Sequence, residues 1–229
     1  MALFAIADLH LSLGTDKPMD VFRGWDDYVS RLERNWRALV DPQDTVVVAG
    51  DISWGMSLEQ SKADFTFLHN LPGRKLLLKG NHDYWWTTRR KMDAFFAENG
   101  LDSLTIIHND AQPVEGRFAV CGTRGWFYDA EEDADKKVLA REIGRLHASV
   151  NAAKQTGLEP IVFLHYPPVF AGQVCEDMMN ALHQQGIARC YYGHIHGAGI
   201  RSAFQGEWAG ITMKLISCDA VAFTPVLIH

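Results

Sequence analysis

The sequence predicts an α/β sandwich, because strands and helices alternate along its first half while several further strands follow one another in its second half. Three observations support this fold class. Short apolar and β-branched runs recur along the chain, residues typical of turns or of metal ligands follow them directly, and the segments between them have helical spacing. A chain of 229 residues with 47% hydrophobic residues can bury a sizeable core, so we expect one domain over residues 1–229.

The strands are predicted where apolar residues run together and then stop abruptly. Several of these runs have no polar face, which is typical of strands that are buried on both sides. In chain order, the predicted strands cover residues 3–7, 45–49, 75–78, 104–107, 118–121, 161–164, 188–192, 211–217 and 220–228.

The helices are predicted in the intervening segments, where apolar residues recur three and four positions apart. They cover residues 25–39, 58–70, 87–99, 133–154 and 174–184. The successive strands near the end of the chain favour two packed layers of strands over one parallel sheet.

Charge and cysteine content narrow the class of protein. The 22 basic and 28 acidic residues give no uniform positive field, which disfavours a nucleic-acid partner. Asp8 interrupts the first apolar run far short of a signal-peptide core or a membrane span, so we expect a cytoplasmic protein without a membrane partner. The four cysteines lack C-x-x-C spacing, which favours free buried thiols.

Two candidate ligand motifs end the first two predicted strands. Asp8 and His10 lie at positions i and i+2, which point to the same side of an extended chain and can share one ion. Asp51 follows Gly50, which permits close backbone approach, and its carboxylate can bridge two ions. Taken alone, the first motif is more often a chance tripeptide, and the second is more often a helix cap or turn.

The third motif, Gly80-Asn81-His82-Asp83, follows the strand at 75–78. It places an amide oxygen, an imidazole and a carboxylate in succession. A turn would explain Gly80 and Asn81 but leaves His82 and Asp83 without a reason, so this motif favours a functional role.

Two histidine motifs complete the set. His165 ends the strand at 161–164, before two prolines that prevent its continuation. His194 and His196 stand at i and i+2 between glycines. A lone histidine in either place would more often be structural, but one shared catalytic edge explains all five motifs together. Nitrogen and oxygen donors without sulfur fit Mn²⁺, Fe or Zn²⁺ better than a thiolate zinc site or a calcium site.

In this order, the five motifs resemble those of the calcineurin-like metallophosphoesterase superfamily. The resemblance extends from Asp8 to His196 and implies a four-layer αββα sandwich with metals at the carboxyl ends of strands. It also implies two divalent metal ions, Mn²⁺ being the expected choice in vitro and Fe or Zn²⁺ the alternatives. One ion would be held by Asp8, His10, Asp51 and His196, and the other by Asp51, Asn81, His165 and His194.

The resemblance further implies catalytic roles and a reaction. His82 would stabilise the transferred phosphoryl group or protonate the leaving oxygen, and Asp83 would orient its ring. Two ions about 3.5–4 Å apart would lower the pKa of a bridging water and neutralise phosphate oxygens. The implied reaction is hydrolysis of a phosphomonoester or phosphodiester of a small soluble molecule, nucleotides included. A phosphoprotein Ser/Thr phosphatase and a catalytically silent metal-binding scaffold are the alternatives.

Candidate substrate-binding residues stand close to these motifs. Trp54, Trp126 and Tyr166 predict an aromatic wall for a planar leaving group, or else simply pack loops against the sandwich. Arg124 can clamp two phosphate oxygens, or form a surface salt bridge. The expected partner is a small phosphorylated substrate.

Overall fold

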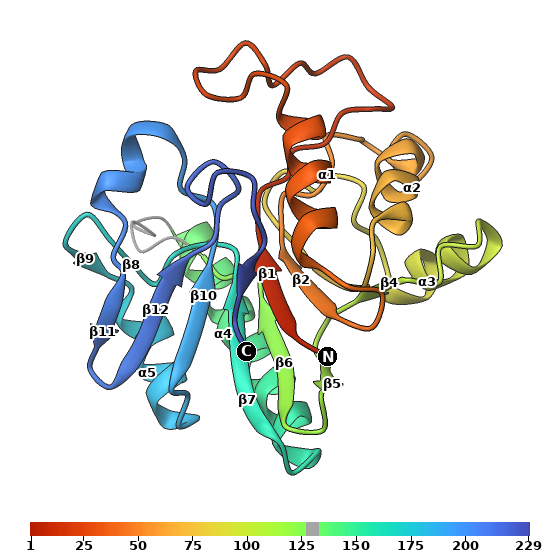
Figure 1. The fold of residues 1–229 in the computed structure, drawn as a ribbon. Helices are drawn as coiled ribbons and strands as arrows, with labels where there is room; N and C mark the ends of the chain where they lie inside the picture. The colour runs from red at the N-terminus through yellow and green to blue at the C-terminus, as the bar shows by residue number, and fades with distance from the viewer. Residues whose placement is uncertain (127–132) are drawn as a thin grey trace.

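The computed structural model describes residues 1–126 and 133–229, which form two large mixed sheets with helices on their outer faces (Figure 1). In the first sheet, strands lie in the order β13-β1-β2-β3-β4, and β13 alone runs antiparallel to its neighbour. These strands are β1 (Leu3–Ile6), β2 (Thr45–Ala49), β3 (Arg74–Leu78), β4 (Leu104–Ile106) and β13 (Val226–Leu227). Three helices connect them: α1 (Tyr28–Leu39), α2 (Lys62–Asn70) and α3 (Arg89–Glu98).

The second sheet has the order β11-β12-β10-β7-β6-β5, with four parallel inner strands and an antiparallel strand at each edge. Its strands are β5 (Ala111–Val114), β6 (Phe118–Thr123), β7 (Glu159–Leu164), β10 (Arg189–Tyr192), β11 (Gly206–Trp208) and β12 (Ile211–Leu215). The remaining elements are α4 (Asp133–Gln155), α5 (Glu176–Gln184), the hairpin β8 (Val169–Phe170) with β9 (Gln173–Val174), and the 3₁₀ helix η1 (Gly197–Ser202).

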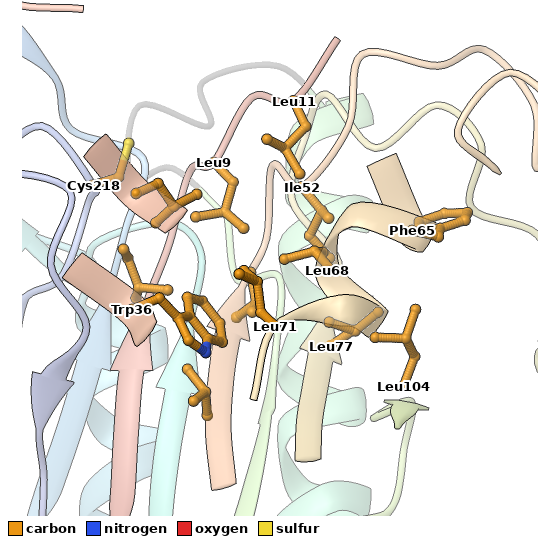
Figure 2. Close-up of a cluster of buried hydrophobic side chains, with 14 of the residues drawn as sticks. Leu9, Leu11, Trp36, Ile52, Phe65, Leu68, Leu71, Leu77, Leu104 and Cys218 are labelled. Carbon is orange, nitrogen blue, oxygen red and sulfur yellow. The ribbon is translucent and has the colours of Figure 1, made fainter. Parts of the chain in front are cut away.

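The alternation of side chains along each strand builds the layers. In β1, Leu3 and Ala5 pack between the two sheets, whereas Phe4 and Ile6 pack outward in the core that lies under α1 and α2 (Figure 2). The second sheet shows the same alternation, with one face toward the first sheet and the other toward α4 and α5. The four-layer αββα sandwich is therefore confirmed. Strands at its centre, such as β1, β2 and β6, are buried along their whole length because both of their faces are covered.

The largest difference from the predicted elements lies near the end of the chain. The strand expected at 220–228 contains only β13, and residues 218–223 form turns. Phe223, at a φ of 56°, turns inward to pack edge-on against Trp25, with ring centroids 5.1 Å apart. Residues 218–223 therefore do not pair in a sheet, and the Phe223 ring contributes to the core instead. All four cysteines are buried free thiols, as predicted. No helix within residues 1–126 and 133–229 has the length and apolar run needed to cross a bilayer.

A buried lysine secures the connection between α2 and β3. Lys75 Nζ donates hydrogen bonds to the carbonyl oxygens of His69 (3.2 Å), Leu71 (2.6 Å) and Gly73 (2.8 Å). Lys75→Met keeps the bulk of the side chain but removes the donor from the carbonyl oxygens of Leu71 and Gly73, so we expect the free energy of unfolding to fall by about 2 kcal/mol. Urea denaturation measures this loss. Lys62→Met, at an exposed position on α2, is the control, and equal stability of both variants would show that water satisfies the carbonyls.

Candidate metal centre

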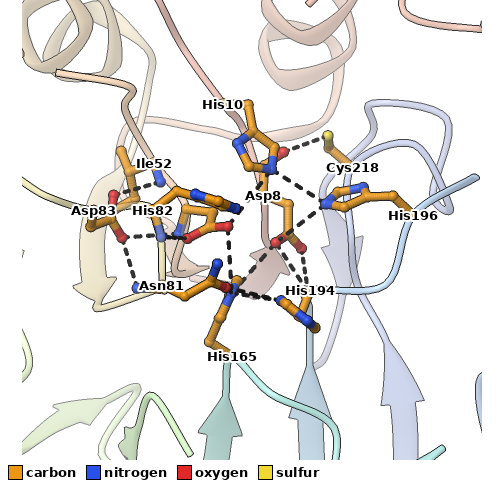
Figure 3. Close-up of polar contacts among 12 residues, drawn as sticks. Asp8, His10, Ile52, Asn81, His82, Asp83, His165, His194, His196 and Cys218 are labelled. Carbon is orange, nitrogen blue, oxygen red and sulfur yellow. Dashed lines mark hydrogen bonds and ion pairs between the residues drawn. The ribbon is translucent and has the colours of Figure 1, made fainter. Parts of the chain in front are cut away.

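The seven predicted ligand residues meet where the carboxyl ends of the two sheets adjoin (Figure 3). Because parallel strands end at a common edge, residues far apart in the sequence come together there. The first sheet supplies all three oxygen donors and one imidazole, and the second sheet supplies the other three imidazoles. Asp8 and His10 follow β1, Asp51 follows β2, Asn81 follows β3, His165 follows β7, and His194 and His196 follow β10.

Asp8, His10 and His196 form one candidate metal-binding triad, whose donor atoms all lie within 4.8 Å of one another. His196 Nε2 is 3.6 Å from Asp8 Oδ1 and 3.3 Å from His10 Nε2. The backbone N–H of His194 also donates to the Asp8 carboxylate, at 2.9 Å. Asp8 therefore joins the end of β1 to the end of β10.

A second triad consists of Asp8, Asp51 and His165, again within 4.8 Å. His165 Nε2 is 3.5 Å from Asp51 Oδ2. Asn81 Oδ1 lies 2.6 Å from His165 Nε2 and 3.0 Å from His194 Nδ1. His165 Nδ1 lies 3.2 Å from the carbonyl oxygen of Ala49, so the tautomer that donates this hydrogen bond leaves Nε2 as the donor atom for a cation.

The chemistry of this donor set fits divalent cations. Asp8 and Asp51 are almost wholly buried, and no lysine or arginine within residues 1–126 and 133–229 forms an ion pair with either. A buried carboxylate needs a compensating positive charge. Imidazole nitrogens crowd the same space, and together these donors form the mixed nitrogen and oxygen set that Mn²⁺, Fe and Zn²⁺ accept.

Burial and mutual repulsion shift the pKa values of these groups. Burial, together with the charge of Asp8, raises the pKa of Asp51 to about 8. Burial alone would also raise the pKa of Asp8, but His196 and the other imidazoles hold it well below its usual range. Burial lowers the pKa of His10 and of His194 to about 3, so both rings are neutral and able to bind a cation at neutral pH.

Four of the candidate metal ligands adopt left-handed backbone conformations. Asp8, His10, Asp51 and His194 have φ values of 62°, 46°, 49° and 72°. Such conformations are unfavourable for residues other than glycine, by about 1–2 kcal/mol each, and they gather at functional sites where the surrounding structure enforces them. A Cβ atom at Gly80 would overlap the carboxylate of Asp51, so the loop after β3 approaches closely only because residue 80 is glycine.

His82 lies beside the metal centre with its ring half-buried. Its backbone N–H donates to Asp51 Oδ1 at 2.7 Å, and its ring centroid is 5.8 Å from that of His10. Burial, followed by the nearby His165, lowers its pKa below the usual value. Its Nδ1 is 3.2 Å from Tyr84 Oη. The ring therefore borders the ligand cluster without belonging to either triad.

The contacts of Asp83 differ from the expectation that this residue orients the His82 ring. Its buried carboxylate instead accepts backbone N–H groups of Asp51 (2.9 Å), Ile52 (2.8 Å) and Gly80 (2.7 Å), and the indole N–H of Trp85 (2.9 Å). Asp83 thus fixes the loop after β2 against the loop after β3. The Asp83 carboxylate points to these backbone N–H groups instead of to His82, because the N–H groups are buried and need acceptors.

Asp219 is a site residue that the sequence reasoning missed. Asp219 Oδ1 lies 2.9 Å from His196 Nδ1, and Oδ2 accepts the N–H of Gly197 at 2.9 Å. Despite burial, Asp8 and Asp219 raise the pKa of His196 to about 10. Asp219 comes shortly after the predicted strand at 211–217, just as the candidate ligands follow their strands. It was not selected as a candidate because it also directly precedes the strand predicted at 220–228.

We expect Asp219→Asn to weaken metal binding about 10- to 100-fold, because a neutral amide replaces the charged carboxylate that orients the His196 ring and makes it a stronger ligand. Titration of the metal-free protein with Mn²⁺ measures this affinity. Asp177→Asn, at an exposed position on α5, is the matched control. Equal affinities for the two variants would mean that Asp219 has no part in orienting His196.

The predicted substrate-binding residues occupy different places. Trp54 stacks on His10, with centroids 5.0 Å apart, and therefore lies at the centre itself. Tyr166 is buried behind His194, at 4.3 Å between ring centroids. The guanidinium of Arg124 lies over the ring of Trp126 at 4.6 Å. Among the three aromatic residues, Trp54 is thus the one that borders both His10 and His82.

Comparisons with known proteins identify the family of this chain. The sequence model of the calcineurin-like phosphoesterases matches residues 1–198. Gene 66 protein of Mycobacterium phage L5 is 36% identical over 80 residues, which are 34% of this chain and 37% of that protein, so the match spans little more than a third of this relative.

Solved structures share the fold at low sequence identity. The protein TT1561 of Thermus thermophilus matches with a TM-score of 0.57 at 11% identity, over 98% of this chain and 96% of that one. A protein of unknown function, AQ665 from Aquifex aeolicus, matches with 0.54 at 13% identity, over 99% and 95%. Phosphopantetheinyl hydrolase (PptH) from Mycobacterium tuberculosis matches with 0.53 at 16% identity, over 94% and 88%.

Proposed function

Since the chain belongs to the calcineurin-like phosphoesterase family, we propose that it hydrolyses a phosphoester at a centre of two divalent metal ions. The observation that carries this proposal is the pair of donor triads that share Asp8 and are buried except for the partly exposed His196, with Asn81 and His194 beside them. When bound there, two divalent cations would supply an activated water and neutralise phosphate oxygens. Mn²⁺ is the first ion to test.

The protein's own residues would hold and protonate the reacting groups. In the part of the chain that the structure describes, the His82 ring contacts a protein hydroxyl through Nδ1, so Nε2 is the atom that would donate to the leaving oxygen. Asp83 and Asp219 would keep the ligands in place, the first through the backbone and the second through His196. Trp54 would support the His82 ring, since their centroids are 4.6 Å apart.

A small phosphomonoester or phosphodiester is the substrate we propose. A mostly apolar cavity of about 340 Å³, lined by residues that include Met19, Phe22, Trp25 and His196, opens beside the first triad. It suits a planar or apolar leaving group, which favours Trp25 as an aromatic contact for substrate alongside Trp54.

The proposal can be tested by measuring the hydrolysis of p-nitrophenyl phosphate and of bis-p-nitrophenyl phosphate, each with and without Mn²⁺. We expect hydrolysis that requires the metal and that EDTA abolishes. The preferred ester separates a monoesterase from a diesterase, and a phosphoserine peptide in the same panel tests the phosphoprotein phosphatase alternative. A protein that binds two metal ions and hydrolyses no phosphoester would instead be a silent scaffold.

A further inference from the structure

A second cavity, which we call the basic cleft, lies at the carboxyl ends of β3, β4 and β6. Its outer part has a volume of about 380 Å³ and is lined by Lys79, Trp86, Thr87, Thr88, His108 and Arg145. A narrow inner part shares four of these residues and adds Arg124. None of these side chains belongs to the two metal-binding triads.

Positive charge exceeds negative charge in this cleft. Lys79, Arg124 and Arg145 contribute three cationic side chains. Glu142, which is buried, pairs with Arg145 (Nη1 to Oε1, 2.6 Å) and more loosely with Arg124 (Nη2 to Oε1, 3.5 Å). Among these four groups, three positive charges face one negative charge, which leaves two in excess.

Among the described residues, Asp110 and Asp83 are two other acidic residues whose charges act on this cleft, and both have partners. Asp110 forms an ion pair with Arg89, at 2.8 Å between Oδ2 and Nη1. Burial and the adjacent Arg145 both lower the pKa of His108, as expected for an imidazole in a positive environment. Within residues 1–126 and 133–229, Lys79 forms no hydrogen bond or ion pair, although its side chain is partly buried.

Unsatisfied hydrogen-bond donors line the same cavity. Arg124 Nε and Trp86 Nε1 are buried, and neither has a hydrogen-bond partner among the residues that the structure describes. A buried donor without a partner is unfavourable by about 1–3 kcal/mol, so such groups usually serve a ligand or a water. Two donors and an unpaired ammonium around one cavity indicate a site for an anion.

The basic cleft adjoins the metal centre through two strand ends. Lys79 precedes Asn81 by two residues, so their Cα atoms lie at most about 7 Å apart. The carbonyl oxygen of Arg124 accepts the backbone N–H groups of His165 (3.1 Å) and Tyr166 (2.8 Å). The basic cleft and the metal centre therefore lie next to each other at the ends of β3 and β6.

Resting on the proposed function, we propose that the basic cleft binds a second phosphate group of the substrate while the ester to be hydrolysed lies at the metal centre. A phosphate group carries close to two negative charges at neutral pH, which matches the two excess positive charges, whereas a carboxylate matches only one. Arg145 and Lys79 supply charge-assisted hydrogen bonds to its oxygens. The substrate class is thus a small bisphosphorylated molecule.

Binding of inorganic phosphate to the metal-free protein tests the cleft without any catalysis. EDTA treatment removes the metal ions that would hold phosphate at the centre, so a loss of affinity in the cleft variants reports on phosphate bound at the cleft. We expect Lys79→Met and Arg145→Gln each to weaken phosphate binding about 10-fold in calorimetric titrations, the loss of one charged hydrogen bond. Arg141→Gln, at an exposed position on α4, is the control and keeps the affinity.

Lys79→Met keeps this test independent of folding, because Lys79 has no partner among the described residues while Arg145 also pairs with Glu142. The melting temperature of Lys79→Met should equal that of the unmutated protein. Undiminished phosphate affinity in both cleft variants would overturn the proposal.

Hydrolysis by the Mn²⁺-loaded protein tests the link to the substrate. We expect kcat/KM for glucose 1,6-bisphosphate to exceed that for glucose 6-phosphate about 10-fold, mainly through KM, and Lys79→Met to remove this advantage. Equal values for both sugars in the unmutated protein would overturn the inference and leave the proposed function standing. Phosphate binding at the cleft without hydrolysis of any phosphoester would instead overturn the proposed function.

Discussion

The His82→Ala protein is expected to hydrolyse p-nitrophenyl phosphate about 10²- to 10⁴-fold more slowly than the unmutated protein while binding the same number of metal ions. The reason is geometric. His82 borders the ligand cluster and contacts Tyr84 through Nδ1, but it is a member of neither metal-binding triad. Its removal should therefore lower kcat without emptying the centre. Rates at saturating Mn²⁺, together with metal analysis of the dialysed protein, measure the two effects separately.

His183→Ala, an exposed position on α5, controls for the loss of a histidine as such. Tyr84→Phe adds a second comparison, since it removes only the hydroxyl that lies 3.2 Å from the His82 ring. We expect its kcat to fall far less than that of His82→Ala. Full activity in His82→Ala would remove the catalytic role, and a loss of metal together with activity would make His82 a ligand.

Asp51→Asn is expected to lower hydrolysis at least about 10³-fold, because the second triad loses one of its two carboxylates and several kcal/mol of charge stabilisation go with it. The asparagine has the same shape, and its Oδ1 can still accept the N–H of His82, as Asp51 does at 2.7 Å. The fold should therefore persist. Metal analysis should find fewer than two ions per chain.

The metal-free Asp51→Asn protein should be more stable than the metal-free unmutated protein at pH 8. Burial and Asp8 raise the pKa of Asp51 to about 8, above its unfolded value of 3.8. A folded-state pKa that is raised means that the folded state binds more protons between these values, so stability falls as the pH rises from about 4 to 8. Asparagine removes this dependence.

Thermal melts in EDTA across this pH range test the expectation, with the exposed Asp26→Asn as control. We expect an advantage for Asp51→Asn of about 1 kcal/mol or more at pH 8 and little difference near pH 4. An Asp51→Asn protein that is less stable at pH 8 would show that the carboxylate supports the fold even without a cation.

The fold and the ligand cluster could be predicted because both depend on local patterns. Apolar runs such as that before Asp51 mark strands, and the topology of parallel strands then brings their ends to one edge. The short strands at the edges of the fold have no such run of apolar residues and could not be predicted. β5 contains Pro113, which is tolerated because an edge strand has unpaired positions, and β8 and β9 have two residues each.

Contacts between distant segments could not be predicted from the sequence. Nothing in the sequence of α4 distinguishes Arg145, which lines the basic cleft, from the exposed Arg141 one turn earlier. The hydrogen bonds of Asp83 to the loop after β2 likewise depend on how two strand ends approach each other. Such roles follow from tertiary packing, which local sequence does not encode position by position.

Selection for stability and selection for metal binding favour different residues at Asp8, His10, Asp51 and His194, because all four have a left-handed backbone. A library evolved only for thermal stability, with no requirement for activity, should drift toward glycine or asparagine there, because those residues relieve the backbone strain. Homologous sequences that carry glycine at several of these positions would then identify lineages that have abandoned the metal centre while retaining the sandwich.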